Sequence, residues 1–334
     1  MSTRLPKVVI LSAGGTITML GAGPMDLTDY GEYGQALPVD EVVSRLDPDA
    51  LVAEVLTLGF RQVSSTAIGP RDWLRMADQI RGLDRDGNGI DGYVVLHGTA
   101  TLEETAYFLH LTVGVEAPVV ITGAQRPISA VSTDAPLNLI QAIAVAASSE
   151  TRGLGVLVAL NGEVHSARDV TKRSTYKLEA FQSPSHGPLG YVDADGRVSV
   201  YRRPTRIAVD GPFGDLLALE LPRVDVSYSY AGADGAAIDA FVAAGARGIV
   251  NAGLAPGKVA SSEEDAVSRA IEAGVVMIRS TRAGGGRVVP RRRLLEQGVI
   301  PADDLTPQKA RVLGMLALAV TDDLSEIAEM FRRF

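Results

Sequence analysis

Cysteine is absent from this chain of 334 residues, and its absence removes three kinds of chemistry. The chain forms no disulfide, binds no metal through a thiolate and has no cysteine nucleophile. Histidine is scarce as well, because only four are present and none shows partners typical of a catalytic triad. A hydroxyl nucleophile in this chain would therefore need a base other than histidine.

Long apolar runs are also missing. No run approaches the ~20 residues that a membrane-spanning helix requires. The first apolar stretch, residues 8–11, is too short for the apolar region of a signal peptide, and no cleavage-site pattern accompanies it. We therefore expect a soluble, cytoplasmic protein with no membrane partner.

Positive charge is in deficit, since 32 lysines and arginines face 40 aspartates and glutamates, for a net charge of -8. A nucleic-acid partner is therefore not expected, because phosphate binding needs clustered basic side chains. One basic cluster follows three consecutive glycines, and a solvated turn is its simplest interpretation. The cluster consists of Arg287, Arg291, Arg292 and Arg293.

Short β-branched bursts alternate with amphipathic stretches, a pattern typical of a parallel sheet covered by helices. Thr101 and Glu104 match a capping box and indicate the start of one helix. The strands predicted in the first half are bounded by glycine or proline and cover residues 7–12, 92–96, 118–122 and 155–159. The helices predicted between them cover residues 71–82, 101–113 and 136–148.

A proline- and glycine-rich break at residues 201–222 interrupts this alternation, which then resumes. We therefore predict an α/β protein with a larger N-terminal parallel-sheet domain at 1–202, a linker at 203–222 and a smaller C-terminal α/β domain at 223–334. The later strands are predicted at 224–228, 248–251 and 275–279, and the later helices at 235–245, 263–273 and 307–321.

Threonine follows a double glycine directly after the first predicted strand, in residues 12–18 (SAGGTIT). The glycines allow a tight turn that exposes Thr16 at the carboxyl edge of the sheet, where ligands gather in open α/β folds. A nucleotide-binding loop is the alternative. Its G-x-G-x-x-G spacing is absent, however, and no pattern that opens a helix follows.

Two further polar side chains follow later strands. Thr99 comes after the strand at 92–96 and beside a helix N-terminus, where developing negative charge is stabilised. Lys172 follows the strand at 155–159 after a turn at Asn161 and Gly162. Lysine can act as a base if its pKa falls from ~10.4 to roughly 7–8. Taken singly, such a threonine is usually a cap and such a lysine a solvated charge.

Residues 84–89 (DRDGNG) reproduce the front half of a calcium-binding loop. The bidentate acid that should follow six residues after the glycine at position 89 is not there, since Val95 occupies that position in a predicted strand. An acidic, glycine-rich turn before a strand explains the segment equally well. We predict no metal site.

Ordered motifs along essentially the whole chain resemble those of the bacterial L-asparaginase/glutaminase family. They are 14–17 (GGTI), 97–101 (HGTAT) with 103–106 (EETA), 123–127 (GAQRP), 168–172 (RDVTK), 187–191 (GPLGY) and 307–311 (PQKAR). The resemblance implies a two-domain asparaginase-like fold and hydrolysis of a small amide to a carboxylate and ammonia. It also implies a homotetramer whose sites are completed between subunits, and no cofactor.

The same resemblance implies catalytic roles for a set of hydroxyl and amine groups. Thr16 matches the nucleophile that forms an acyl-enzyme, and Thr99 with Lys172 matches the second catalytic pair. The lid that carries a catalytic tyrosine maps onto residues 21–37. Tyr33 fits better by its distance from the following helix start, and Tyr30 is the alternative.

Substrate contacts follow from the resemblance too. Ser65 matches the serine that holds the substrate's α-carboxylate, and Ala124 matches a residue whose main chain contacts the scissile amide. Ala100 stands where the family has a carboxylate for the substrate's α-ammonium, and Thr66 where a glutamine joins that task. Pro256 replaces an asparagine supplied by another subunit, and residues 287–295 contain no evident counterpart of a late acid.

These departures all concern one side of the substrate. An ammonium group that loses a charge-assisted hydrogen bond costs about 1.5–3 kcal/mol. We therefore predict a substrate without a free α-amino group, such as an acylated amino acid, a simple amide or an imide. The alternatives are an L-asparaginase impaired or inactivated at Ala100 and a non-catalytic binding protein on the same fold.

Overall fold

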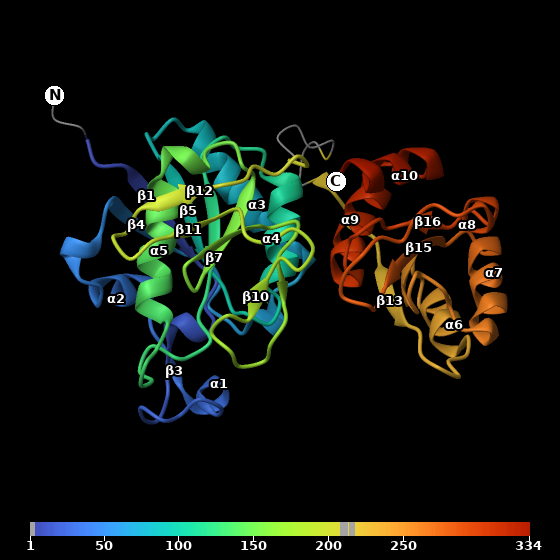
Figure 1. Cartoon of the computed structure of the whole chain (residues 1–334), viewed down its shortest axis with the longest axis horizontal. Coiled ribbons are helices and arrows are strands. Elements are labelled where there is room, and N and C mark those ends of the chain that lie inside the picture. The colour runs from blue at the N-terminus through green and yellow to red at the C-terminus, as the bar shows by residue number, and fades with distance from the viewer. Residues whose placement is uncertain (1–3, 208–212, 214–217) are drawn as a thin grey trace. The chain divides into compact units, whose positions relative to one another are not determined.

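The computed structural model describes residues 4–207, 213 and 218–334 (Figure 1). The chain divides into two compact units, residues 1–211 and 212–334. Part of the predicted linker at 203–222, namely 208–212 and 214–217, lies outside the described residues. None of the helices among the described residues combines the length and apolarity needed to cross a membrane.

An eight-stranded sheet forms the centre of the first unit, with the order β12-β11-β8-β7-β6-β5-β1-β4. Five neighbouring strands run parallel: β4 (Glu54–Gly59), β1 (Lys7–Ser12), β5 (Gly92–Leu96), β6 (Val119–Thr122) and β7 (Val156–Leu160). The remaining three are antiparallel: β8 (Glu163–Ser166), β11 (Gly190–Val192) and β12 (Val198–Val200).

The sheet is therefore mixed, whereas the sequence predicted a parallel one. The reason is the two-residue turn between β7 and β8. Asn161 and Gly162 both have positive φ, at 52° and 78°. Positive φ at both central residues defines the hairpin turn that matches the twist of antiparallel strands. This hairpin reverses the chain direction where a further crossover helix would be needed to keep the sheet parallel.

Helices cover both faces of the parallel strands. Helix α5 (Ala135–Ala147) contacts β1, β5, β6 and β7 on one face, where α2 (Val39–Ser44) joins the same apolar core. Helix α4 (Leu102–Thr112) contacts β6 and β7 and packs against α3 (Pro70–Arg85). Figure 1 shows α5 crossing in front of the strands. Burial on both faces explains the continuous apolar runs of β1 and β5.

The predicted capping box of α4 is not formed. Thr101 is the N-cap residue, but its side chain makes no capping hydrogen bond. Its hydroxyl donates instead to the carbonyl oxygen of Ser65, at 2.8 Å. The physical reason is competition: a hydroxyl that bonds a neighbouring segment is not available to the first turn of its own helix.

Short elements connect the main strands, and most escaped the sequence patterns because they span only a few residues. Those of the first loop are β2 (Met19–Leu20), α1 (Tyr30–Tyr33) and β3 (Gln35–Ala36). A two-stranded pair, β9 (Thr171–Lys172) with β10 (Phe181–Gln182), follows β8. Single 3₁₀ turns lie at Thr16–Thr18, Pro48–Ala50, Ser65–Ala67 and Ser149–Thr151.

The second unit is built on a four-stranded parallel sheet in the order β13-β14-β15-β16. Its strands are β13 (Val224–Tyr228), β14 (Gly248–Gly253), β15 (Val276–Thr281) and β16 (Ile300–Pro301). Its helices are α6 (Ala236–Ala243), α7 (Glu264–Glu272), α8 (Arg292–Glu296), α9 (Pro307–Val320) and α10 (Leu324–Arg333), with a 3₁₀ turn at Ser261–Glu263. The predicted α/β alternation is thus present in this unit.

Candidate functional site

The loops after β1 and β5 meet at a glycine-to-glycine contact. Gly15 has a φ of 96°, and a Cβ placed on it would lie 2.4 Å from the Cα of Gly98. Only a residue without a side chain permits this approach. Because β1 and β5 are adjacent and parallel, the next residue of each loop, Thr16 and Thr99, reaches the same edge of the sheet.

A cavity of about 380 Å³ opens at this edge, and Thr16, Thr99, Tyr30, Ser65 and Ala100 are among its lining residues. No aspartate, glutamate, lysine, arginine or histidine lines it within the part of the chain that the structure describes. The cavity is therefore polar through hydroxyl groups and the Gln62 amide, and not through formal charges. It is large enough for a small organic molecule.

Thr16 has a phenol as its hydrogen-bond partner. The Thr16 Oγ1 and Tyr30 Oη atoms lie 3.0 Å apart, a distance at which either group can donate. Tyr30 begins the short helix α1, and Tyr33 ends it with 82% of its surface exposed. The structure therefore brings Tyr30, and not Tyr33, to the hydroxyl of Thr16.

Asp26 organises the loop that carries Tyr30. One carboxylate oxygen accepts hydrogen bonds from the backbone N–H groups of Asp29 and Tyr30, at 3.0 and 3.1 Å. The other accepts from Ala22, at 3.0 Å. These hydrogen bonds hold the pKa of Asp26 below its usual value, and the bond from Ala22 has the largest effect. Sequence reasoning missed Asp26, although an aspartate just ahead of a short helix is a common anchor of loop backbone.

Lys172 is the partner of Thr99. Its Nζ donates to Thr99 Oγ1 at 2.7 Å, and its backbone N–H donates to Glu103 Oε1 at 3.1 Å. Burial lowers the pKa of Lys172, while the nearby Glu103 carboxylate raises it. Burial is the larger effect, so the amine loses its proton more readily than a solvated lysine does. The pair can therefore move a proton.

A hydrogen-bonded chain behind the cavity supports the segment that ends in Thr99. Trp73 Nε1 donates to Thr105 Oγ1 at 2.8 Å, and Thr105 Oγ1 lies 2.9 Å from His97 Nε2. His97 Nδ1 lies 2.8 Å from the carbonyl oxygen of Gly98. The Gly98 carbonyl oxygen only accepts, so His97 carries its proton on Nδ1, and its Nε2 atom accepts from the Thr105 hydroxyl.

This histidine is neutral. Complete burial lowers the pKa of His97 to about 4, although its bond to the Gly98 carbonyl opposes the shift. His97 does not line the cavity. Its contribution is to fix the peptide between Gly98 and Thr99, and the sequence singled out neither Trp73 nor Thr105 for that task.

The predicted substrate-binding residues fall into two groups. Ser65 and Ala100 line the cavity, and a Cβ on Gly98 would lie 2.8 Å from Ser65 Oγ, so these segments are in close contact. Thr66 is exposed, and its hydroxyl bonds Ser64 Oγ at 2.9 Å. Ala124 is buried outside the cavity lining, next to Gly123, whose Cβ would lie 3.1 Å from Thr99 Cγ2.

Residues 84–89, which match the front half of a calcium-binding loop, begin inside a helix. Asp84 and Arg85 complete α3, and the Tyr93 hydroxyl donates to Asp84 at 3.5 Å. Over residues 4–207, 213 and 218–334 no group of three or more His, Asp or Glu side chains has an arrangement that could hold a metal ion. Pro256 and residues 287–295 belong to the second unit.

Two family models together match most of the chain. The model described as "Asparaginase, N-terminal" matches residues 7–206. The model described as "Glutaminase/Asparaginase C-terminal domain" matches residues 223–331. The first model therefore covers most of the first unit, and the second model covers most of the second unit.

Individual relatives agree with this match over most of their length. The chain is 37% identical to a protein named probable L-asparaginase periplasmic of Haemophilus influenzae, covering 99% of this chain and 93% of the relative. It is 37% identical to a glutaminase-asparaginase of Pseudomonas fluorescens, covering 98% and 91%. A solved structure titled as a probable cytoplasmic L-asparaginase from Campylobacter jejuni superposes with a TM-score of 0.93 at 36% identity, covering 98% of this chain and all of that one.

Proposed function

This chain belongs to the asparaginase/glutaminase family of amidohydrolases, and from that premise we propose that Thr16 attacks the carbonyl carbon of a small amide held in the cavity. The observation that carries this proposal is the pairing of two hydroxyl groups on one cavity. Thr16 is bonded to a phenol and Thr99 to an amine of lowered pKa. The products are ammonia and a carboxylate.

The first step forms an ester and releases ammonia. Thr16 Oγ1 bonds to the amide carbon while its proton passes to the Tyr30 oxygen, 3.0 Å away. The proton of the phenol passes in turn to the amide nitrogen, the carbon–nitrogen bond breaks and ammonia leaves. A hydroxyl needs such a relay because it is a poor nucleophile while it keeps its proton.

The second step returns the enzyme to its starting state. Water attacks the ester carbon while one of its protons passes through the Thr99 hydroxyl to the neutral amine of Lys172, 2.7 Å away. The ester bond breaks, and Thr16 regains a proton relayed from Lys172. The acid product then loses its remaining proton to solvent. Closure of the Tyr30 loop over the cavity would exclude bulk water from both steps.

The substrate that we propose lacks a free α-amino group. The cavity contains the methyl group of Ala100 where the family resemblance implies a carboxylate, and no acidic side chain lines it among the described residues. An ammonium group placed there would have no countercharge from the described lining. Acylated amino acids, simple amides and imides avoid that loss.

Ammonia release from a panel of amides tests the reaction. The panel contains L-asparagine, L-glutamine, N-acetyl-L-asparagine and succinamic acid, with T16A as the test variant. T205A, an exposed threonine of the same unit, is the control. We expect turnover of at least one amide that lacks a free amino group, with kcat reduced by about 10⁴-fold or more in T16A and unchanged in T205A. Binding of ligands without turnover of any amide would instead support a non-catalytic binding protein.

The variant A100D tests the substrate class. A carboxylate at position 100 restores an ionic partner for an α-ammonium group. We expect kcat/KM for L-asparagine to rise by about 10- to 100-fold relative to that for succinamic acid. If the natural chain already prefers L-asparagine over succinamic acid, the substrate proposal is wrong and an asparaginase with or without impairment takes its place.

Two further proposals concern the oligomeric state of the protein and its location in the cell. A homotetramer with sites completed between subunits is our proposal from the family resemblance, and sedimentation equilibrium measures it directly. We also propose a cytoplasmic location, because the matched structure from Campylobacter jejuni is titled as a probable cytoplasmic L-asparaginase. The names of the matched proteins point to both compartments, so cell fractionation decides between them.

A further inference from the structure

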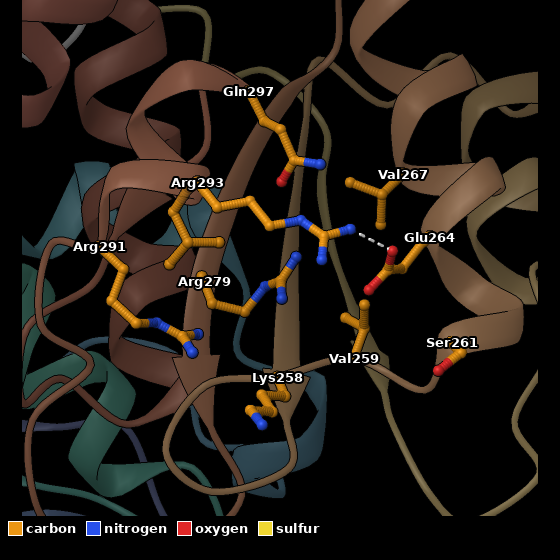
Figure 2. A pocket seen from close by; sticks show the side chains of 10 residues that line it. Lys258, Val259, Ser261, Glu264, Val267, Arg279, Arg291, Arg293 and Gln297 are labelled. Atoms are coloured by element: carbon orange, nitrogen blue, oxygen red, sulfur yellow. Dashed lines mark hydrogen bonds and ion pairs between the residues drawn. The ribbon is translucent and has the colours of Figure 1, made fainter.

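A second cavity, of about 270 Å³, lies wholly within the second unit (Figure 2). It is formed by the turn after β14, the start of α7, strand β15 and the segment around α8. Four of its lining side chains are basic and one is acidic. They are Lys258, Arg279, Arg291 and Arg293 with Glu264. A basic cavity in a chain with a net charge of -8 calls for an explanation.

Arg279 is a buried guanidinium with too few partners. Its surface is 3% exposed, and its Nε atom has no hydrogen-bond partner in the described part of the chain. Its Nη1 atom donates a long hydrogen bond, of 3.4 Å, to the carbonyl oxygen of Gly257. Burial lowers the pKa of Arg279 to about 10, with a further contribution from Arg291. Buried cations without partners are costly and are normally paired.

Arg291 shares the same acceptor. Its Nη2 atom donates to the Gly257 carbonyl oxygen at 2.8 Å. Two like charges are thus gathered over one neutral oxygen, an arrangement that repels unless a negative charge joins it. Figure 2 shows the Arg279 side chain at the centre of the group, with Arg291 on one side of it.

The protein supplies little negative charge to balance this cluster. Glu264 forms an ion pair with Arg293. Glu263 is buried and accepts from the backbone N–H of Ala260 at 2.9 Å, and both glutamates favour the charged form of Arg279 without offsetting its burial. Within the described residues, Lys258, Arg279 and Arg291 have no carboxylate at ion-pair distance.

The sequence interpreted the arginine cluster as a solvated turn, and this holds for some of its residues but not for others. Arg292 is a solvated charge, with 91% of its side chain exposed and an ion pair to Glu296, and Arg287 pairs with Asp303. Arg291 and Arg293, in contrast, line the cavity. The alternation arises because neighbouring residues at the start of α8 point in different directions. A solvated turn therefore describes only part of the cluster.

We propose that this cavity binds a small oxyanion of about two negative charges, a dicarboxylate or inorganic phosphate, held by Arg279 and Arg291 with Lys258. The guanidinium fork matches the oxygen geometry that carboxylates and phosphates share. The volume of about 270 Å³ is below the range of drug-sized sites, so a ligand of a few heavy atoms fits it. This site is independent of the amide chemistry proposed above.

Calorimetric titration of the full chain at constant ionic strength tests the proposal. Sodium phosphate and sodium succinate are titrated separately, with sodium chloride as the ionic-strength control. The test variant is R291Q, and R292Q is its matched control because it removes the same charge from the adjacent, solvated position. We expect saturable binding of one anion per chain, weakened by about 10-fold or more in R291Q and by less than about 2-fold in R292Q.

The results of these titrations either identify the ligand or exclude the proposed anion site. Binding of phosphate alone, succinate alone or both, weakened in R291Q but not in R292Q, supports the site and names its ligand. The proposal is overturned if neither anion binds saturably below about 10 mM, or if R291Q and R292Q weaken binding equally. It is also overturned if succinate binds R291Q as tightly as the natural chain, since the anion then sits elsewhere. If R291Q does not fold, K258M replaces it, because Lys258 is exposed and lines the same cavity.

Discussion

The hydroxyl oxygens of Thr16 and Tyr30 lie 3.0 Å apart, although Thr16 lies in the 3₁₀ turn that follows β1 and Tyr30 begins the short helix α1. Thr16 is held by the contact of Gly15 with Gly98, and Tyr30 by the backbone hydrogen bonds of Asp26. The contact therefore depends on two separately anchored segments.

Removing the phenol oxygen should slow the reaction. In Y30F, Thr16 loses the hydrogen-bond partner to which we assign its proton. We expect kcat on the best amide of the panel to fall by about 10²- to 10⁴-fold, the usual contribution of one general acid–base group. The matched control is Y33F in the same helix, because Tyr33 is 82% exposed and does not contact Thr16. A larger loss in Y33F than in Y30F would reverse the assignment.

The pH dependence of the rate should report on Lys172. A lysine that acts as a base in ester hydrolysis must be neutral, so kcat measured on an amide for which that step limits the rate should rise with pH and level off below the ordinary lysine pKa of ~10.4. Glu103 raises the pKa of Lys172, and E103Q removes that charge. The lysine then loses its proton at lower pH, so the rising limb should shift to lower pH in E103Q.

A carboxylate elsewhere in the same unit provides the control for this experiment. Glu116 is exposed and is not among the causes of the Lys172 shift, so E116Q should leave the pH profile in place. A rising limb that moves to higher pH in E103Q, or that moves equally in both variants, would contradict the role of Lys172 as the titrating base.

Glycine at position 15 should be irreplaceable. In G15A the new methyl group meets Gly98 Cα at 2.4 Å in a backbone conformation that L-residues rarely adopt. We expect the free energy of unfolding to fall by at least about 2 kcal/mol, with loss of amide turnover. G82A is the contrasting variant, since Gly82 lies inside α3 with open space around it, and it should gain up to about 1 kcal/mol. Urea denaturation measures both changes.

Lowering the pH should reduce the free energy of unfolding, because His97 is buried in its neutral form. Burial lowers its pKa to about 4, whereas an unfolded chain has a histidine pKa of ~6.5. Between these values the unfolded state binds more protons, so stability is fully present above about pH 6.5 and is lost as pH falls towards 4. His110 has the same lowered pKa, of about 4, and adds to the effect.

The test compares urea denaturation at about pH 7 and about pH 5 in the natural chain and in H97Q. Glutamine can still accept the Thr105 hydrogen bond but does not titrate. We expect H97Q to show a smaller loss of unfolding free energy on acidification, by an amount on the order of 1–3 kcal/mol. An unchanged pH dependence in H97Q would mean that His97 does not stay neutral in the folded protein.

Much of the fold follows from the sequence because burial leaves a local pattern. The bounds of β1 and β5 were predicted correctly, since the centre of each strand is a continuous apolar run that is buried. Strand β4 was not predicted, because it lies at the edge of the sheet and alternates exposed and partly buried residues. The antiparallel strands β8, β11 and β12 were missed for a related reason: they are only three or four residues long.

The candidate site, like the fold, has some features that the sequence predicts and others that it does not. The sequence alone determined that Thr16, Thr99 and Lys172 follow strands, because strand ends and glycine turns are local features. Only the tertiary structure decided that Tyr30 and not Tyr33 meets Thr16, that Thr101 bonds Ser65, and that Arg291 lines a cavity while Arg292 faces solvent. Each of these depends on the path of a loop or on the direction of one side chain. Such choices are set by contacts with residues distant in the sequence, which no local pattern encodes.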